Sequence, residues 1–243
     1  MSLFALDQRP GSEARYRRIA MELEKEIAAF GKAGMALAPE PQLAARFGVN
    51  RHTLRRAVDE LVNAGLVERR HGRGVFVLRD PIAYPIGSAT RFTSTVAYLG
   101  HAADSRLVRK QIILAQGGVA KRLALPCGEP VAWIETVRLA DAVPLVLISH
   151  FLPAIRFPGL LEAYDGGSLH ALLLERYNTE LARHESLVTA ALPLGDDAEL
   201  LAMPRNRPVL RVKTVNRITA DGTPGEYALS RFRADRVQLQ FAF

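Results

Sequence analysis

Cysteine, long apolar runs and metal-binding motifs are almost absent from this chain. Its 243 residues include a single cysteine, Cys127, so neither a disulfide framework nor a cysteine-rich zinc site can form within it. No apolar run approaches the roughly 20 residues that a membrane-spanning helix requires. The opening MSLFALDQRPGSEARY lacks the basic and then apolar pattern of a secretory signal. These absences predict a protein of the reducing cytoplasm that does not enter a membrane.

The signals of catalysis are also missing. The six histidines are scattered along the chain, and the lone cysteine lies in the turn-like segment LPCGEP. No nucleophile and base stand in a catalytic pattern, and no spacing suits metal ligands. The sequence therefore predicts a protein without catalytic residues, metal or cofactor.

Positive charge, by contrast, is plentiful and unevenly placed. The net charge is +7, and between Arg46 and Arg79 eight arginines stand against three acidic residues, so this short stretch holds five of the seven charges. Such an excess suits a polyanionic partner, although most charge runs are simply the solvated face of a helix. The neighbouring residues decide between these two interpretations.

The first third of the chain predicts three helices and a hairpin. Apolar residues at helical spacing predict a helix over 14–30, and PQLAARFG predicts a short second helix that ends at Gly48. Asn50 is suited to cap a third helix, which closes near Gly65. LVERRHGRGVFVL then alternates around a glycine-containing turn, as a two-stranded hairpin does. Together these elements form a winged helix-turn-helix, which is a DNA-binding arrangement.

The third predicted helix separates anchoring residues from exposed ones. Leu54, Val58 and Leu61 form one apolar stripe, whereas basic residues lie away from it, at the end that a recognition helix inserts into the major groove. The hairpin adds a cationic tip, RRHGRG, that suits the DNA backbone or the minor groove. The predicted DNA-contacting residues are Arg46, Arg51, His52, Thr53, Arg55, Arg56, His71, Gly72 and Arg73.

The segment PQLAARFGVNRHTLRRAVDELVNAGLVERRHGRGVFV resembles the DNA-binding domain of the GntR family of bacterial repressors, and the resemblance extends over about residues 12–78. It implies contacts to the bases or phosphates of double-stranded operator DNA from the third helix and the wing. In one departure, Pro41 stands where the family usually has a phosphate-binding arginine, so Arg46 becomes the candidate for that contact. A winged helix that contacts only proteins is the alternative interpretation.

A change of composition marks a domain boundary. RDPIAYPIGSATRF is rich in proline, glycine and small polar residues, which is typical of a linker. We therefore expect a DNA-binding domain at 1–78, a linker at 79–90, and an effector-binding and dimerisation domain at 91–243. Beyond the linker, strand-like segments such as PVAWIETVRLAD mix with helical ones such as GSLHALLLERY, which predicts an α+β domain.

This second part resembles the effector domain of the HutC branch of the GntR family in the stretches TRFTSTVAYLG, ISHFLP, DGGSLHALL, RVKTVNR and PGEYALSRFRAD. The resemblance implies an antiparallel-sheet fold of the chorismate-lyase-like (UTRA) type. Several stretches are similar to regulators of phosphonate metabolism, which implies a repressor of phosphonate or phosphate-ester uptake and breakdown genes. The alternatives are a HutC-type regulator that responds to a histidine-degradation metabolite or a sugar phosphate, and an enzyme related to chorismate lyase.

The second part of the chain supplies candidate effector-binding residues, most of them in these stretches, and Arg138 at the end of a strand pattern. Arg91 lies beside Thr93 and Ser94, and an arginine among hydroxyls suits the oxygens of a phosphate or phosphonate. Ser168 and His170 begin a predicted helix, whose free N–H groups favour an anion. The full set is Arg91, Thr93, Ser94, Arg138, Ser149, His150, Ser168, His170, Glu226, Tyr227 and Ser230.

Structural explanations exist for several of these residues. Arg138 could pair with Glu135 or Asp141 at the surface, Ser168 could cap its helix, and a histidine such as His150 is more often a core residue. The collection of these groups in stretches that resemble an effector domain nevertheless favours a site for a small anionic effector.

Two-fold symmetry is expected of a regulator that binds a palindromic operator. We therefore predict a homodimer, with one reading helix for each half of the operator. The strand segments VKTVN and YALSRF are the candidates for pairing across the subunits.

Overall fold

The computed structural model describes residues 12–70, 72–78, 81–87 and 92–242. Contacts within the chain gather into two compact units, Met1–Asp80 and Pro81–Phe243. Each unit is a continuous stretch of chain with a hydrophobic core of its own.

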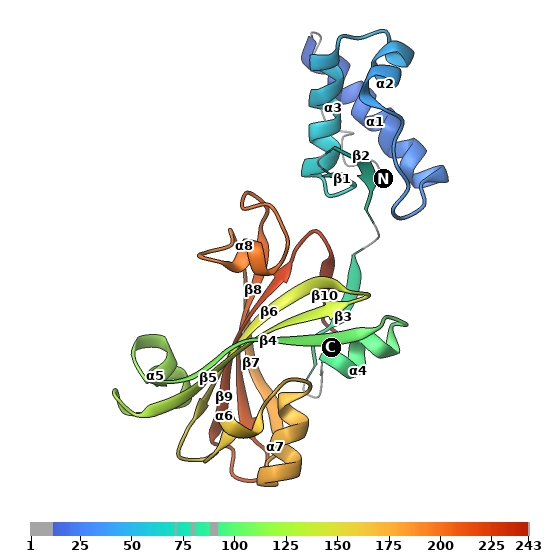
Figure 1. Ribbon diagram of the computed structural model, residues 1–243. Helices are drawn as coiled ribbons and strands as arrows, with labels where there is room; N and C mark the ends of the chain where they lie inside the picture. The colour runs from blue at the N-terminus through green and yellow to red at the C-terminus, as the bar shows by residue number, and fades with distance from the viewer. Residues whose placement is uncertain (1–11, 71, 79–80, 88–91, 243) are drawn as a thin grey trace. The chain divides into compact units, whose positions relative to one another are not determined.

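The first unit is a set of three helices closed by a short hairpin (Figure 1). The side chain of Asn50 caps α3 by accepting a hydrogen bond from the backbone N–H of Thr53 at 2.8 Å. Gly48 ends α2 with a φ of 59°, a left-handed conformation that glycine adopts without strain. The predicted winged helix-turn-helix is confirmed, and its elements are α1 (Ser12–Phe30), α2 (Glu40–Phe47), α3 (Arg51–Asn63), β1 (Val67–Arg70) and β2 (Gly74–Val77).

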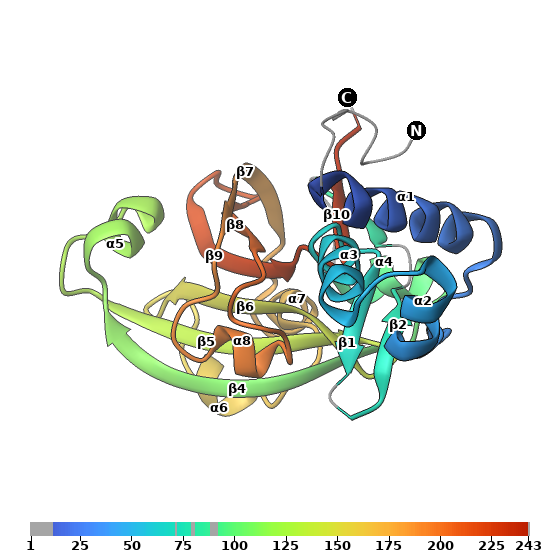
Figure 2. The ribbon, with the colours of Figure 1, turned by 90° about the horizontal axis from the view of Figure 1, so that it is seen from above.

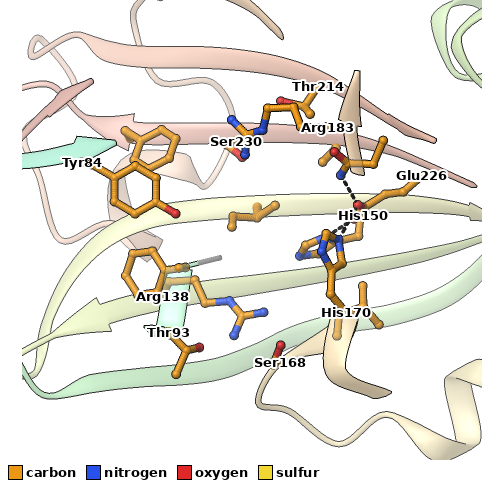
Figure 3. Close-up of a pocket in the computed structure, with 16 residues that line it drawn as sticks. Tyr84, Thr93, Arg138, His150, Ser168, His170, Arg183, Thr214, Glu226 and Ser230 are labelled. Atoms are coloured by element: carbon orange, nitrogen blue, oxygen red, sulfur yellow. Dashed lines mark hydrogen bonds and ion pairs between the residues drawn. The ribbon is translucent and has the colours of Figure 1, made fainter. Parts of the chain in front are cut away.

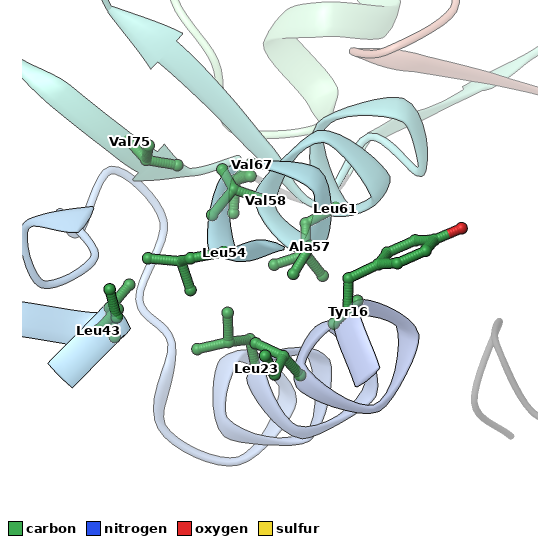
Figure 4. Close-up of a cluster of buried hydrophobic side chains, with 12 residues drawn as sticks. Tyr16, Leu23, Leu43, Leu54, Ala57, Val58, Leu61, Val67 and Val75 are labelled. Atoms are coloured by element: carbon green, nitrogen blue, oxygen red, sulfur yellow. The ribbon is translucent and has the colours of Figure 1, made fainter. Parts of the chain in front are cut away.

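One apolar cluster holds this unit together (Figure 4). Leu54 and Val58 of α3 pack with Leu23 of α1 and Leu43 of α2, and Val75 of β2 belongs to the same cluster. Burial of each such aliphatic side chain contributes roughly 1.5–3 kcal/mol. The apolar stripe therefore fixes the orientation of α3 and leaves the first turn of that helix in solvent.

The second unit is built on a six-stranded antiparallel sheet (Figures 1 and 2). Because successive side chains on a strand point to opposite faces, each strand contributes to two different layers. The predicted α+β fold with an antiparallel sheet is confirmed. In spatial order the strands are β4 (Ala103–Leu114), β5 (Pro130–Ala140), β6 (Val143–Pro153), β9 (Pro224–Arg233), β8 (Val209–Ile218) and β7 (Leu181–Ala191).

Short helices cover both faces of this sheet. One face, which carries Val137 and Tyr227, packs against α5 and α8. The opposite face, which carries Ile134 and Phe232, packs against α4, α6 and α7. The covering helices are α4 (Phe92–Tyr98), α5 (Gly117–Leu123), α6 (Leu160–Ala163), α7 (Leu169–Tyr177) and α8 (Asp197–Leu200).

A strand occupies part of the segment that the sequence predicts to be a linker. This strand, β3 (Ile82–Pro85), pairs in parallel with β10 (Val237–Gln240), near the carboxyl end of the chain. Tyr84 of β3 is buried, and its ring centre lies 5.4 Å from that of Phe232. The prolines that suggest a linker are compatible with a strand here, because a two-stranded pair consists only of edges.

The predicted pairing of VKTVN and YALSRF across subunits is wrong. These segments lie in β8 and β9, which pair with each other. The outer side of β8 pairs with β7, and the outer side of β9 pairs with β6. Neither strand has a free edge, so within the described residues the edges of this sheet are β4 and β7.

Gly225 on β9 has no room for a methyl group. A Cβ atom there would lie 2.5 Å from Cδ2 of Leu181 and 2.8 Å from Cγ1 of Ile218, and both side chains are buried. We expect Gly225→Ala to destabilise the second unit by about 1–3 kcal/mol, because these neighbours must shift. Urea unfolding followed by the fluorescence of Trp133, the single tryptophan, measures the loss.

Gly118 provides the matched control. It lies in α5, and nothing lies within 4 Å of the position that its Cβ would occupy. Gly118→Ala should leave stability unchanged or raise it by up to about 1 kcal/mol, because alanine is the better helix former. Similar losses for both variants would contradict the steric explanation of Gly225.

Candidate functional site

The first turn of α3 presents polar side chains to solvent. Arg51 and His52 are exposed, and neither forms a hydrogen bond or ion pair with another described residue. Thr53 is half-buried, and its backbone N–H is already bonded to the Asn50 cap. Two of the predicted DNA-contacting side chains are therefore unengaged at the helix end where backbone N–H groups favour phosphate.

Other predicted DNA-contacting residues are engaged within the first unit. Arg46 donates hydrogen bonds to Glu26, and this pairing lowers the pKa of Glu26 and raises that of Arg46. The guanidinium of Arg56 lies 4.2 Å from the centre of the Tyr16 ring. The Arg46 guanidinium can therefore contact phosphate only if it shares or leaves Glu26, and Arg56 is held against α1.

The wing is tied to the two helices that precede it. Arg69 of β1 donates to Asp59 of α3 and to Glu40 of α2, the latter at 3.3 Å. Arg55 also approaches Glu40, with 3.8 Å between its Nε and Oε2. At the tip of the hairpin Gly72 has a φ of 68°, and the neighbouring Arg73 is exposed, while His71 lies outside the described residues.

The second unit contains a cavity on the sheet face that α4 and α7 cover (Figure 3). This sheet cavity has a volume of about 90 Å³. About 10–15 Å³ of such volume admits one water molecule, so the cavity admits a ligand of a few heavy atoms. Its lining residues are Tyr84, Phe92, Thr93, Arg138, Ile148, His150, Ser168, Leu169, His170, Arg183, Thr214, Asn216, Glu226, Ala228, Ser230 and Phe232.

Most of the predicted effector-binding residues meet in the sheet cavity. Strand alternation brings Arg138 of β5, His150 of β6, and Glu226 and Ser230 of β9 to one face of the sheet. The loops and helices around that face add three more predicted residues, Thr93, Ser168 and His170.

Two predicted residues, Ser149 and Tyr227, lie on the opposite face of the sheet. Ser149 donates a hydrogen bond to Glu135 at 2.5 Å and accepts one from Arg231 at 3.0 Å. Tyr227 stacks on Phe151, with 5.8 Å between the ring centres. Each is the sequence neighbour of a cavity residue, so strand alternation turns it away.

Two further predicted residues are not placed in the cavity. Ser94 is an exposed residue of α4 and is not among the lining residues. Arg91 lies outside the described residues.

Glu226 is the fully buried centre of a polar cluster at the cavity wall. Its carboxylate accepts hydrogen bonds from Nδ1 of His150 at 2.5 Å, from Nε2 of His170 at 2.7 Å, and from the side-chain amide of Asn216. Burial raises the pKa of Glu226, but the attraction of His170 and the hydrogen bonds from both histidines outweigh it. They hold that pKa well below its usual range. Glu226 is therefore ionised, and it orients both imidazoles.

Several hydrogen-bond donors in the cavity lack a partner. Nε of Arg138, and Nε and Nη1 of Arg183, are buried and bond to no described residue, although Nη1 of Arg138 donates to the Gly167 carbonyl at 2.6 Å. Burial lowers the pKa of Arg183, and burial raises the pKa of Tyr84 to about 12, so its phenol stays neutral. Buried donors are nearly always bonded in native proteins, and this convergence of cationic donors suits an anion.

Sequence reasoning missed four polar residues of the cavity. Thr214 and Asn216 stand two residues apart in the stretch RVKTVNR, so a strand places both on one face, and that spacing could have identified them. Arg183 is the third residue of β7, and Tyr84 of β3 lies in the predicted linker. No local pattern marks these last two residues, because tertiary packing brings them to the cavity.

Metal-binding clusters and membrane-spanning helices are not found in the part of the chain that the structure describes. No group of three or more His, Cys, Asp or Glu residues there could hold a metal ion. No described helix is long and apolar enough to cross a bilayer.

Two family models match the chain. Residues 15–77 match the model described as bacterial regulatory proteins of the gntR family, and residues 99–238 match the UTRA domain. The first match covers the helices and hairpin of the winged unit, and the second covers the six-stranded sheet.

Individual proteins match over nearly the whole chain. The chain is 38% identical over 225 residues to the "Probable transcriptional regulator PhnF" of Escherichia coli strain K12, and the match covers 93% of each protein. It is 32% identical over 205 residues to the HTH-type transcriptional repressor NagR of Bacillus subtilis strain 168, covering 83% of each. The crystal structure of PhnF from Mycobacterium smegmatis matches with a TM-score of 0.65 and 30% identity, over 93% of this chain and 98% of that one.

These matches are to transcriptional regulators rather than enzymes, and they agree with the exposed first turn of α3 in the first unit and the ligand-sized cavity of the second. The chain belongs to the GntR family of bacterial transcriptional regulators, in which it joins a DNA-binding helix-turn-helix domain to a UTRA domain that binds a small-molecule effector.

Proposed function

We propose that this regulator is a dimeric repressor of genes for the uptake and breakdown of phosphonates or phosphate esters. In this proposal the effector is an anionic phosphorus compound that binds in the sheet cavity. The observation that carries it is the set of buried, unpartnered guanidinium donors of Arg138 and Arg183 in one small cavity. Planar guanidinium groups match the oxygens of a phosphoryl group.

The similar proteins support this class of effector. PhnF regulators match at 38% and 33% identity, and the name PhnF agrees with the resemblance to phosphonate-metabolism regulators. NagR and a repressor of a mannosyl-D-glycerate transport and metabolism system also match, at 32% and 26% identity, so regulators with other names are similar to this chain and a sugar phosphate is kept as the alternative effector. The small volume of the sheet cavity, about 90 Å³, favours a compact phosphonate over a sugar phosphate.

A thermal-shift screen separates these effectors. Methylphosphonate, 2-aminoethylphosphonate, phosphate, glucosamine 6-phosphate and urocanate are compared on the full chain. A ligand at about 100 times its Kd stabilises the folded state by roughly 2.7 kcal/mol. Stabilisation by a phosphonate supports the proposal, whereas stabilisation by urocanate or by the sugar phosphate alone overturns it.

Removal of either cavity arginine should abolish this stabilisation. We expect Arg138→Met and Arg183→Met to weaken effector binding by about 2–5 kcal/mol, because a buried phosphoryl group loses its charged partner. Arg183→Met should not lower the stability of the ligand-free protein, because it removes a half-buried cation whose Nε and Nη1 bond to no described residue. Calorimetric titration with the phosphonate found in the screen gives the affinities.

The exposed Arg205 serves as the control for these variants, because it lies outside the cavity lining. Arg205→Met should bind the effector as the unaltered protein does. If Arg138→Met and Arg183→Met bind the effector with unchanged affinity, the effector does not bind in the sheet cavity, whether or not the protein binds DNA.

For the DNA-binding unit we propose that Arg51 and His52 reach base edges and that Arg73 contacts the backbone. Arg51→Ala should weaken binding to the operator by about 1–3 kcal/mol and relax base preference there. Arg73→Ala should weaken binding to all sequences alike. It should also reduce the slope of the logarithm of the binding constant against the logarithm of salt concentration by about 1, the contribution of one phosphate contact. Titrations on operator and random DNA at several salt concentrations measure both effects.

The matched control for the loss of charge is Arg205→Ala in the second unit. It should leave binding to both DNAs unchanged. Equal losses on operator and random DNA for Arg51→Ala would contradict its assignment as a base-reading residue.

For the homodimer we propose that two copies pair along β7. This edge strand is uncharged from Ser186 to its end at Ala191, and Leu187 and Val188 are about two-fifths exposed, at 42% and 41%. The other edge, β4, carries Arg109 and Lys110 near its middle, and two-fold pairing there would bring like charges together. A self-complementary interface is therefore better provided by β7.

Leu187→Lys tests this interface. A lysine on an edge strand opposes pairing with another strand, so we expect the variant to sediment as a monomer at micromolar concentration. Leu174→Lys is the control, because Leu174 is 51% exposed but lies on α7. Dimers in both variants, or monomers in both, would exclude β7 as the specific interface.

A further inference from the structure

His150 presents an acceptor rather than a donor to the sheet cavity. Its ring is buried, with 5% of its surface exposed, and its Nδ1 lies 2.5 Å from Oε1 of Glu226. An ionised carboxylate can only accept hydrogen bonds, so Nδ1 of His150 carries the hydrogen. Nε2, the other ring nitrogen, is buried and has no hydrogen-bond partner among the described residues.

The surroundings of His150 keep the ring neutral. Burial lowers the pKa of His150, and the positive charge of Arg138 acts in the same direction, against the hydrogen bond and the attraction of Glu226. Arg183 lines the same cavity from β7 and adds a further cation. In a neutral ring whose Nδ1 carries the hydrogen, Nε2 bears a lone pair.

The sheet cavity therefore combines two requirements. The guanidinium groups of Arg138 and Arg183 supply donors for negatively charged oxygens, whereas Nε2 of His150 needs an oxygen that carries a hydrogen. A phosphonate or phosphate monoester that retains one P–O–H group meets both requirements. A sulfonate or sulfate of the same shape supplies only acceptors.

We propose that His150 selects phosphonates and phosphate monoesters over isosteric sulfonates and sulfates, by accepting the hydrogen of a P–O–H group at Nε2. This inference rests on the proposed function, because it assigns the effector to the sheet cavity.

Binding of a P–O–H group at Nε2 predicts that the ligand takes up a proton on binding when the pH is above its second ionisation. The second ionisation of a phosphate monoester lies near pH 6, and phosphonates ionise near neutral pH. Below that ionisation the ligand brings its own hydrogen into the cavity. Above it the free ligand is a dianion, so binding takes one proton from solvent, which is then held between a ligand oxygen and Nε2. The apparent affinity therefore falls about tenfold for each further pH unit.

A sulfonate has no ionisable hydrogen at these pH values. In the cavity its oxygen lone pairs would face the lone pair of Nε2, and the two would repel each other. Protonation of the His150 ring from solvent would remove this repulsion, but burial and the nearby Arg138 disfavour a charged ring. An unmatched buried acceptor of this kind is expected to weaken binding by about tenfold or more.

Calorimetric titration of the full chain with isosteric pairs tests the selection. The pairs are methylphosphonate with methanesulfonate and 2-aminoethylphosphonate with 2-aminoethanesulfonate. We expect the phosphorus compound to bind at least about tenfold more tightly in each pair that binds. Titration at about pH 8.5 in two buffers of different ionisation enthalpy should show uptake of one proton per bound phosphonate.

His150→Asn removes the acceptor while it keeps a donor for Glu226, because the asparagine amide occupies the place of Nδ1. We expect this variant to lose both the preference for phosphorus compounds and the proton uptake. His101→Asn is the matched control, because His101 pairs with Asp141 and is not among the residues that line the cavity. The control should retain both properties.

The outcomes separate the inference from the proposed function. If no phosphorus compound binds, the proposed function fails and the inference fails with it. If phosphonate and sulfonate bind the unaltered protein equally, or if no proton is taken up at about pH 8.5, the inference alone is overturned. Unchanged selection in a folded His150→Asn variant would show that another group makes the distinction.

Discussion

The alternation of side chains along six antiparallel strands is the constraint on which the second unit depends. A shift of one residue moves a side chain from the sheet cavity to the opposite face. His150 therefore lines the cavity while Ser149 joins the hydrogen-bonded network of Glu135 and Arg231. The same rule lets each strand serve two purposes, because one face carries the cavity and the other packs against α5 and α8.

Burial of an ionised Glu226 is the main electrostatic feature of that cavity. A carboxylate removed from water is costly unless its oxygens are bonded, and three donors from β6, α7 and β8 satisfy it. The carboxylate in turn fixes the orientation of two imidazole rings, because each ring donates a hydrogen bond to it. Arg138 and Arg183 differ from Glu226, because some of their buried N–H donors form no hydrogen bond with any described residue.

Much of this architecture follows from local sequence signals. The helix-turn-helix has an N-cap at Asn50 and a left-handed glycine at position 48, so its helices could be delimited without tertiary information. The pairing of β3 with β10 joins the two ends of the second unit and has no local signal. Most of the cavity residues that were predicted lie in stretches marked by the family resemblance, but a marked stretch contains both faces of a strand. That ambiguity explains why Tyr227 was included and why Thr214 was missed, whereas Arg183 was missed because it lies outside every marked stretch.

The uncharged edge of β7 has a consequence beyond assembly. The outer edge of β7 has backbone groups that pair with no other described strand, and the run SLVTAALPLG carries no charge. Such an edge can pair with an extended segment of another chain, which is a route to aggregation. Many edge strands are protected by lysine, a bulge or a covering helix. In β7 the irregularity of register lies between Arg183 and Glu185, before the uncharged run, and the residues of that run from Leu187 to Ala190 are exposed. The proposed pairing of two copies along β7 would cover this edge, so on that proposal the unpaired subunit is the form that aggregates, and dilution below the dimer dissociation constant favours aggregation.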